Sequence, residues 1–167
     1  MKIITEKTKL ARSVTNLQGA LQERHFSTIA IKTTPKGCTL AACDRLITIY
    51  SELSCDSTCG EDFFVPAKLF TDTIKELPAG KVTLEKKSQQ LVIKGGENEA
   101  FMMRIPTQEE LVWPDAPSFE GHQKIHLKLD AKRLGHMIDQ VLFCISQESS
   151  RNYGSVAYFH QSQKGSL

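Results

Sequence analysis

The chain has 167 residues, 40% of them hydrophobic and 24% charged, which suits one ordinary globular domain or one domain and part of another. Its formal net charge of +2 is too small to predict nucleic-acid binding by bulk attraction, so any contact with DNA must depend on individually placed charges. The opening segment lacks the apolar core of a signal peptide, and no apolar run approaches the roughly 18 residues that cross a bilayer. We therefore expect a cytoplasmic protein without a membrane partner.

The first predicted helix follows a short alternating strand at residues 2–5. Glu6 opens the helix, where a carboxylate suits both the cap and the helix dipole. Arg12 and Asn16 are predicted on the solvent-facing side. The apolar residues are spaced 4, 3 and 4 positions apart, which places them in one stripe: Leu10, Val14, Leu17 and Leu21.

A second helix is predicted to begin at Pro66, after a strand at residues 63–65, and to run to about Leu77, where Pro78-Ala79-Gly80 stops it. Strands 38–43 and 47–50 are expected to pair around Asp44-Arg45. Further strands are predicted at residues 81–85, 90–94 and 100–104, with a turn at 86–89 and a linker at 105–121. In the second helix, Leu69, Phe70, Ile74 and Leu77 are predicted to face inward, and Lys68, Thr71 and Lys75 outward.

The sequence contains an internal repeat. A strand at 125–129 and an acidic cap, Asp130, precede a third helix whose apolar stripe lies 124 positions after the first: Leu134, Ile138, Val141 and Ile145. Residues 28–40 also align without a gap with residues 155–167. The repeat predicts an α+β fold of repeated units, each a mostly antiparallel sheet with two helices on one face. One complete unit spans 1–122, and 123–167 holds the incomplete start of a second.

The outer faces of the three helices carry mainly cationic or neutral polar groups; in the third helix these are Lys132, Arg133, His136 and Gln140. Such faces suit sequence-independent contact with phosphates, because an ammonium group reads charge and not base edges. The alternative is an ordinary solvated helix face. Residues 123–167 carry six Lys+Arg and three Asp+Glu, and residues 1–122 carry 15 and 16, so the excess of cations lies in the second part.

The sequence shows no catalytic or metal-binding signature. Its five cysteines, Cys38, Cys43, Cys55, Cys59 and Cys144, are odd in number and form no CxxC pair, which favours reduced thiols over disulfides or a zinc site. The histidines are scattered, and neither GxGxxG nor a P-loop is present. We therefore expect a protein that is not an enzyme and holds no cofactor.

Four segments, in this order, resemble the bacterial sliding clamps, the beta subunits of DNA polymerase III. They are the opening MKIITEKTKL, the junction VPAKLF at 65–70, the Ile-Pro and Trp-Pro pairs of 105–114, and FCISQESSR at 143–151. The resemblance implies a DNA-clamp fold with three such domains per subunit and two subunits closed head to tail into a homodimer ring. It also implies the function of a processivity factor in DNA replication. Such a ring encircles duplex DNA and tethers the replicative polymerase without chemistry of its own.

The resemblance and the helix faces together imply two sets of site residues. The DNA-binding set is Arg12, Arg24, Lys68, Lys75, Lys132, His136, Gln147, Glu148 and Arg151. The subunit-interface set is Lys68, Leu69, Lys94, Phe101 and Met103. Glu97 and Glu99 depart from the family because they occupy a region that is often basic. Polymerase and clamp loader are expected to bind through domains absent from this chain, and the alternative function is a truncated clamp-like module that binds replication partners without encircling DNA.

Overall fold

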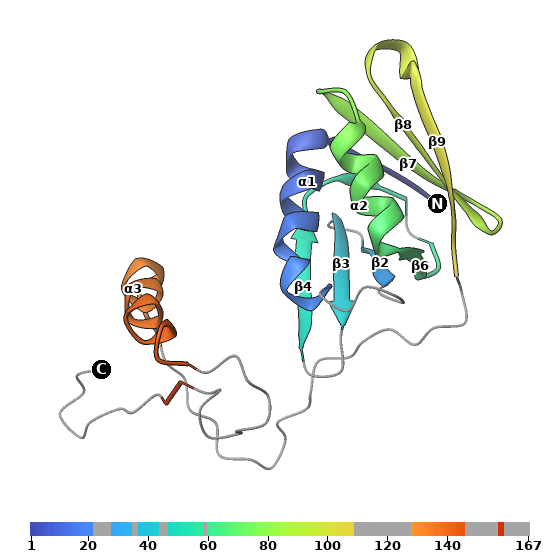
Figure 1. Cartoon of the computed structure of the whole chain (residues 1–167). Coiled ribbons are helices and arrows are strands. Elements are labelled where there is room, and N and C mark those ends of the chain that lie inside the picture. The colour runs from blue at the N-terminus through green and yellow to red at the C-terminus, as the bar shows by residue number, and fades with distance from the viewer. Residues whose placement is uncertain are drawn as a thin grey trace. The chain divides into compact units, whose positions relative to one another are not determined.

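Antiparallel strand pairing organises the first part of the chain into two sheets (Figure 1). The computed structural model describes residues 1–21, 28–34, 37–43, 47–58, 60–108, 128–145 and 157–158. The chain divides into two compact units, Met1–Pro117 and Ser118–Leu167. That the second unit is the start of a further domain of the same kind stays a prediction.

The larger sheet of the first unit has five strands in the order β5-β1-β7-β8-β9, and the smaller has four in the order β4-β3-β2-β6. Every strand pair in both sheets is antiparallel. The larger sheet comprises β5 (Asp56–Ser57), β1 (Lys2–Glu6), β7 (Lys81–Lys87), β8 (Gln90–Gly95) and β9 (Phe101–Pro106). The smaller comprises β4 (Thr48–Leu53), β3 (Gly37–Cys43), β2 (Thr28–Thr34) and β6 (Phe63–Pro66).

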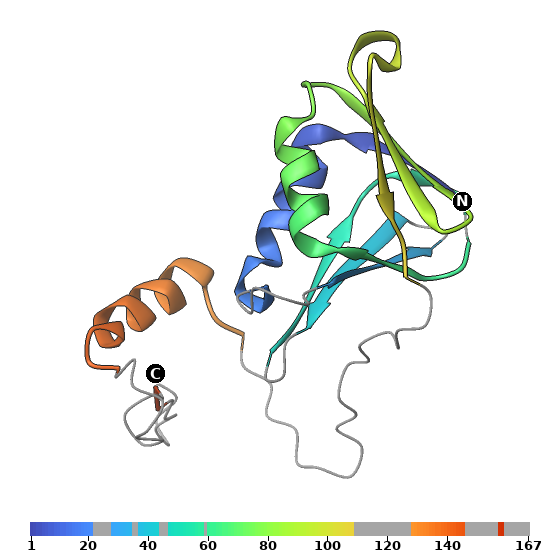
Figure 2. The same ribbon diagram turned by 45° about the vertical axis from the view of Figure 1, so that its right-hand side comes forward.

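Two helices, α1 (Lys7–Asn16) and α2 (Ala67–Glu76), lie side by side in both views (Figure 1, Figure 2). α1 packs on β4, and α2 packs on β6, β2 and β9. Side chains from both helices and both sheets share one apolar core. Its largest fully buried members include Phe63, Phe70, Leu10 and Leu84. The α+β fold with mostly antiparallel sheets and two helices is thereby confirmed.

The first helix follows the predicted stripe, because Leu10, Val14 and Leu17 are buried and Leu21 packs at the margin of the core. The predicted cap at Glu6 differs in detail. Glu6 occupies the cap position, but its side chain accepts no capping hydrogen bond. The N–H of Lys7 instead donates to the carbonyl oxygen of Gly80 at 2.9 Å. A 3-10 turn, η1 (Gln18–Ala20), follows the helix.

The second helix corrects one inward prediction. Leu69 is 41% exposed, whereas Thr73 is only 4% exposed and donates from its hydroxyl to the carbonyl of Leu69 at 2.7 Å. The inward face therefore runs through Ala67, Phe70 and Ile74, and Thr71, predicted to point outward, is half-buried. Counting apolar residues missed this because a Thr can bury its hydroxyl by bonding to the preceding turn.

The predicted linker begins too early. Ile105 is 1% exposed and pairs with Leu91 inside the sheet, because the alternation of β9 continues to Pro106. Gln108 then forms a bridge with Phe64 of β6, with N–H to carbonyl bonds of 3.0 and 2.9 Å in the two directions. Residues 105–108 thus belong to the folded unit, and the rest of the predicted linker lies outside the described residues.

The second unit contains one described helix, α3 (Ala131–Leu142). Asp130 caps it as predicted, since one carboxylate oxygen accepts from the N–H groups of Lys132 at 3.1 Å and Arg133 at 3.0 Å. None of its residues is buried in the described structure, and Ile138 and Val141 are 37% and 42% exposed. Of the strand predicted before it, residues 128 and 129 form no strand and 125–127 lie outside the described residues.

Candidate interaction surfaces

The solvent-facing side of α1 carries only cations and neutral polar groups. Arg12 and Asn16 are exposed, as predicted, and Thr8, Lys9 and Thr15 lie exposed beside them. Asn16 is partly engaged, because its amide nitrogen lies 3.4 Å from the Ser51 hydroxyl of β4. Arg12 forms no ion pair within the described part of the chain. Its guanidinium is therefore available to an external anion.

The exposed side of α2 is electrostatically mixed. Lys68 and Lys75 are exposed, as predicted, but the Lys75 ammonium lies 3.6 Å from the carboxylate of Asp72. A neighbouring acid weakens the attraction of Lys75 for phosphate, since the pair is close to neutral. Of the cations predicted on this helix, Lys68 is the stronger candidate for contact with DNA.

The exposed residues of α3 include the predicted Lys132, Arg133, His136 and Gln140. Asp139 is exposed as well, so the helix is not purely cationic. The other residues of the predicted DNA-binding set, namely Arg24, Gln147, Glu148 and Arg151, lie outside the described residues.

Three residues of the predicted subunit interface lie on α2 and β9, two elements that contact each other. Leu69 is 41% exposed, Met103 is 40% exposed, and Phe101 is half-buried against the core. Lys94 lies on the opposite face of the sheet from Met103. In the register of β8 and β9, Lys94 is opposite Met102, whereas Met103 is opposite the buried Ile93, and neighbouring residues of a strand point to opposite faces.

Two further exposed residues of β9, Met102 and Arg104, were not in the predicted interface set. Met102 is the most exposed apolar side chain of β9, at 53%. The strict alternation of a strand could have revealed both, because they fall on the face opposite Phe101 and Met103.

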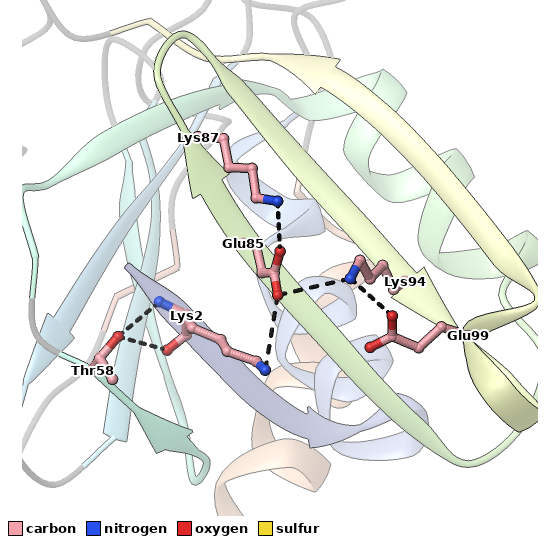
Figure 3. A network of polar contacts seen from close by, with 6 residues as sticks. All are labelled: Lys2, Thr58, Glu85, Lys87, Lys94 and Glu99. Atoms are coloured by element: carbon pink, nitrogen blue, oxygen red, sulfur yellow. Dashed lines mark hydrogen bonds and ion pairs between the residues drawn. The ribbon is translucent and has the colours of Figure 1, made fainter.

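Lys94 belongs to an ion network on the outer face of the larger sheet (Figure 3). Glu85 lies at its centre, 3.8 Å from Lys2, 3.3 Å from Lys87 and 3.8 Å from Lys94, and Lys94 lies 2.8 Å from Glu99. Burial alone would raise the pKa of Glu85, but the hydrogen bond with Lys87 and the surrounding lysine charges together lower it. Glu85 joins three strands, and Lys94 links the network to the β8–β9 turn through Glu99.

A polar pocket of about 540 Å³ opens where β1 meets β5, lined by Ile4, Thr5, Glu6, Lys9, Ser54, Cys55, Asp56 and Lys81. Its only thiol is unsuited to nucleophilic chemistry. Burial, and then the negative charge of Asp56, raise the pKa of Cys55, although a hydrogen bond with Ser57 lowers it in part. An activated cysteine needs the opposite shift.

No group of three or more His, Cys, Asp or Glu side chains that could hold a metal ion occurs among the described residues. Within the same residues, no helix combines the length and apolar character needed to cross a membrane.

Comparison with known proteins decides the family. The sequence model of the DNA polymerase III beta subunit, N-terminal domain, matches residues 1–112. The chain belongs to the DNA polymerase III beta subunit family. It is 26% identical over 164 residues to the Beta sliding clamp of Bacillus subtilis (strain 168), covering 90% of this chain and 42% of that protein.

Solved structures of sliding clamps share the fold. The DNA polymerase sliding clamp from Caulobacter crescentus superimposes with a TM-score of 0.79 at 23% identity, covering 92% of this chain and 42% of that one. The sliding clamp from Bartonella birtlesii bound to griselimycin gives a TM-score of 0.80 at 21% identity, covering 92% and 41%. This member of the beta subunit family therefore spans less than half the length of the relatives it matches, so the resemblance to the family is confirmed but the activity of a whole clamp is not.

Proposed function

We propose that the chain serves as a segment of a sliding clamp, a ring that encircles duplex DNA and tethers the replicative polymerase as a processivity factor. The observation that carries the proposal is the family match over residues 1–112, which covers the folded two-sheet unit and both of its helices. The function is topological and not catalytic, because a ring that encloses DNA needs neither a reacting group nor base recognition.

The exposed faces of the helices support contact with DNA. Arg12 and Lys68 present cations without an ion-pair partner among the described residues, and Lys132 and His136 are exposed on α3. Loose, water-separated phosphate contacts from such groups hold a duplex without fixing its register, which is what sliding requires. The β9 edge with Leu69, Phe101 and Met103 supports contact with another clamp segment, as an unpaired strand edge accepts a further strand.

A domain exchange tests the proposal. Residues 1–167 would replace the matching segment of the Bacillus subtilis clamp, and the chimera would be loaded on nicked circular DNA. A clamp segment should give a chimera that stays on circular DNA and slides off once the DNA is cut. A chimera that folds and dimerises, as judged by circular dichroism and sedimentation, but leaves circular and linear DNA equally fast would sink the proposal. That result would favour an interaction module that never encircles DNA.

A further inference from the structure

The polar pocket beside β1 exists because β1 extends beyond its partner β5. β5 pairs with β1 only at Ile3 and Ile4, whereas on its other side β1 pairs with β7 as far as Glu6. Residues 54 and 55 do not continue the pairing, so on this side Thr5 and Glu6 have no strand partner within the described part of the chain. The space of about 540 Å³ that opens there is in the size range of small-ligand sites.

The residues that line this pocket divide into a buried floor and a charged rim. On the floor, Thr5 is only 6% exposed, and Ile4 and Cys55 are half-buried. The Thr5 hydroxyl donates to the carbonyl oxygen of Ser54 at 3.4 Å. The rim consists of exposed charged residues from four elements, namely Glu6 of β1, Lys9 of α1, Asp56 of β5 and Lys81 of β7. The rim therefore carries two positive and two negative charges.

The four charged groups of the rim do not neutralise one another in pairs. None of them forms an ion pair with any other residue in the part of the chain that the structure describes. Glu6 and Lys81 are opposite each other in the register of β1 and β7, and even they do not form an ion pair. Glu6 caps α1 by position alone, since its side chain accepts no capping hydrogen bond. All four charges can therefore interact with a ligand.

A ligand of a single charge does not suit this rim. A phosphate attracted by the two lysines would also meet two carboxylates, and a metal cation attracted by the carboxylates would also meet two ammonium groups. An apolar ligand would displace water from charged groups without replacing its hydrogen bonds. A ligand with separate positive and negative ends can place each end beside its opposite. The charge pattern thus favours a zwitterion.

We propose that the pocket binds a small zwitterion of the class of free amino acids and short unblocked peptides. The carboxylate of this ligand lies beside Lys9 and Lys81, its ammonium group lies beside Glu6 and Asp56, and its polar middle faces the Thr5 hydroxyl. The site goes beyond the proposed clamp function, because it shares no residue with the DNA-binding set or the subunit-interface set. Ligand titration tests the pocket, and the chimera on circular DNA tests the clamp function, so either can fail without the other.

Titration of the isotope-labelled full chain with triglycine, followed by NMR, tests the proposal. Triglycine carries one free ammonium and one free carboxylate group, and a ligand of its size should bind with a Kd of about 1 mM. The amide resonances of Thr5, Glu6, Cys55 and Asp56 should shift along one saturation curve. N-acetyl-triglycine and triglycine amide each keep a single charge and should bind about fivefold more weakly. No saturable shift at these residues up to about 20 mM triglycine, or equal affinity for the three probes, would overturn the proposal.

Charge variants then test whether the rim holds both ends of the ligand. Lys9→Gln and Asp56→Asn should each weaken triglycine binding about fivefold, because each removes one attraction at one end. Arg104→Gln and Glu76→Gln are the charge-matched controls, since both residues are exposed, form no ion pair within the described residues and lie outside the pocket lining. The controls should bind triglycine like wild type, and circular dichroism confirms that each variant is folded. Rim variants that bind like wild type, or controls that lose as much affinity as the rim variants, would rule out this site.

Discussion

The ammonium nitrogen of Lys7, at the start of α1, lies 3.0 Å from the carbonyl oxygen of Lys75, near the end of α2. The same ammonium donates to the carbonyl of Leu77, and the Lys7 N–H bonds to Gly80. A cation at a helix C-terminus satisfies carbonyls that lack a partner within the helix and complements the helix dipole. Lys7 therefore fastens the beginning of one helix to the end of the other.

Replacing Lys7 with Met should lower the free energy of unfolding by about 1–2 kcal/mol, because the C-terminal carbonyls of α2 lose a charged donor while the apolar stem is kept. Chemical denaturation followed by circular dichroism would measure the change. Lys9→Met is the matched control: Lys9 is exposed on the same helix, and its replacement should shift stability by less than about 0.5 kcal/mol. Equal effects of the two variants would contradict the capping role.

The neighbours Leu69 and Phe70 should respond very differently to truncation. Phe70 is fully buried, so Phe70→Ala should destabilise the fold by about 3–5 kcal/mol through lost burial and the cavity left behind. Leu69 is 41% exposed, and Leu69→Ala should cost less than about 1 kcal/mol. Thermal and chemical unfolding of both variants checks the pair. Comparable losses of stability would mean that Leu69 faces inward, as the helical spacing predicted.

The elements of this fold were predictable from the sequence because alternation and helical spacing depend on local burial. The stripe of α1, the cap at Asp130 and the stop before Pro78 are all local signals, and the structure has them where they were predicted. The inward position of Thr73 was not predictable, since it depends on a hydroxyl bond within the helix.

The candidate surfaces were less predictable because they depend on contacts between segments far apart in the chain. Lys94 was expected at a subunit interface on grounds of resemblance, yet its ammonium is shared by Glu85 and Glu99. The pairing of Lys75 with Asp72 could have been found from the sequence, because residues three positions apart on a helix are neighbours.

The thiol of Cys38 should resist alkylation. Burial, and to a lesser extent the nearby Cys55, raise its pKa from 9.0 to about 12, which lowers its thiolate fraction at neutral pH about 1,000-fold. Brief treatment of the folded protein with iodoacetamide should label the exposed Cys43 and Cys144 first and leave Cys38 unmodified until denaturant is added. Mass spectrometry of peptides gives the order. Early labelling of Cys38 would mean that β3 opens far more readily than its burial implies.

The ion network around Glu85 should make the free energy of unfolding depend on pH in the acidic range. The pKa of Glu85 is lowered in the folded protein, so its contribution is present above the unfolded value near 4.5 and is lost as pH falls through the lower, folded value. Glu85→Gln should therefore destabilise the protein at neutral pH, and the difference from wild type should shrink at about pH 3. Unfolding free energies at both pH values provide the measurement. A difference that stays constant with pH would show that the carboxylate charge does not contribute.

The cations on the helices should differ in their effect on DNA binding. The logarithm of the DNA-binding constant falls linearly with the logarithm of the salt concentration, and each lysine or arginine that neutralises a phosphate steepens this slope by about 1. Arg12→Ala should therefore reduce this slope by about 1, whereas Lys75→Ala should reduce it less, because Asp72 already lies 3.6 Å from the Lys75 ammonium. Arg104→Ala removes an equal charge, also without an ion pair among the described residues, from the outer face of the larger sheet, and serves as the control for net charge alone. Titration of a duplex of arbitrary sequence with each variant at several salt concentrations measures the slopes. Equal reductions for Arg12 and Arg104 would mean that the duplex responds to total charge and not to the face of α1.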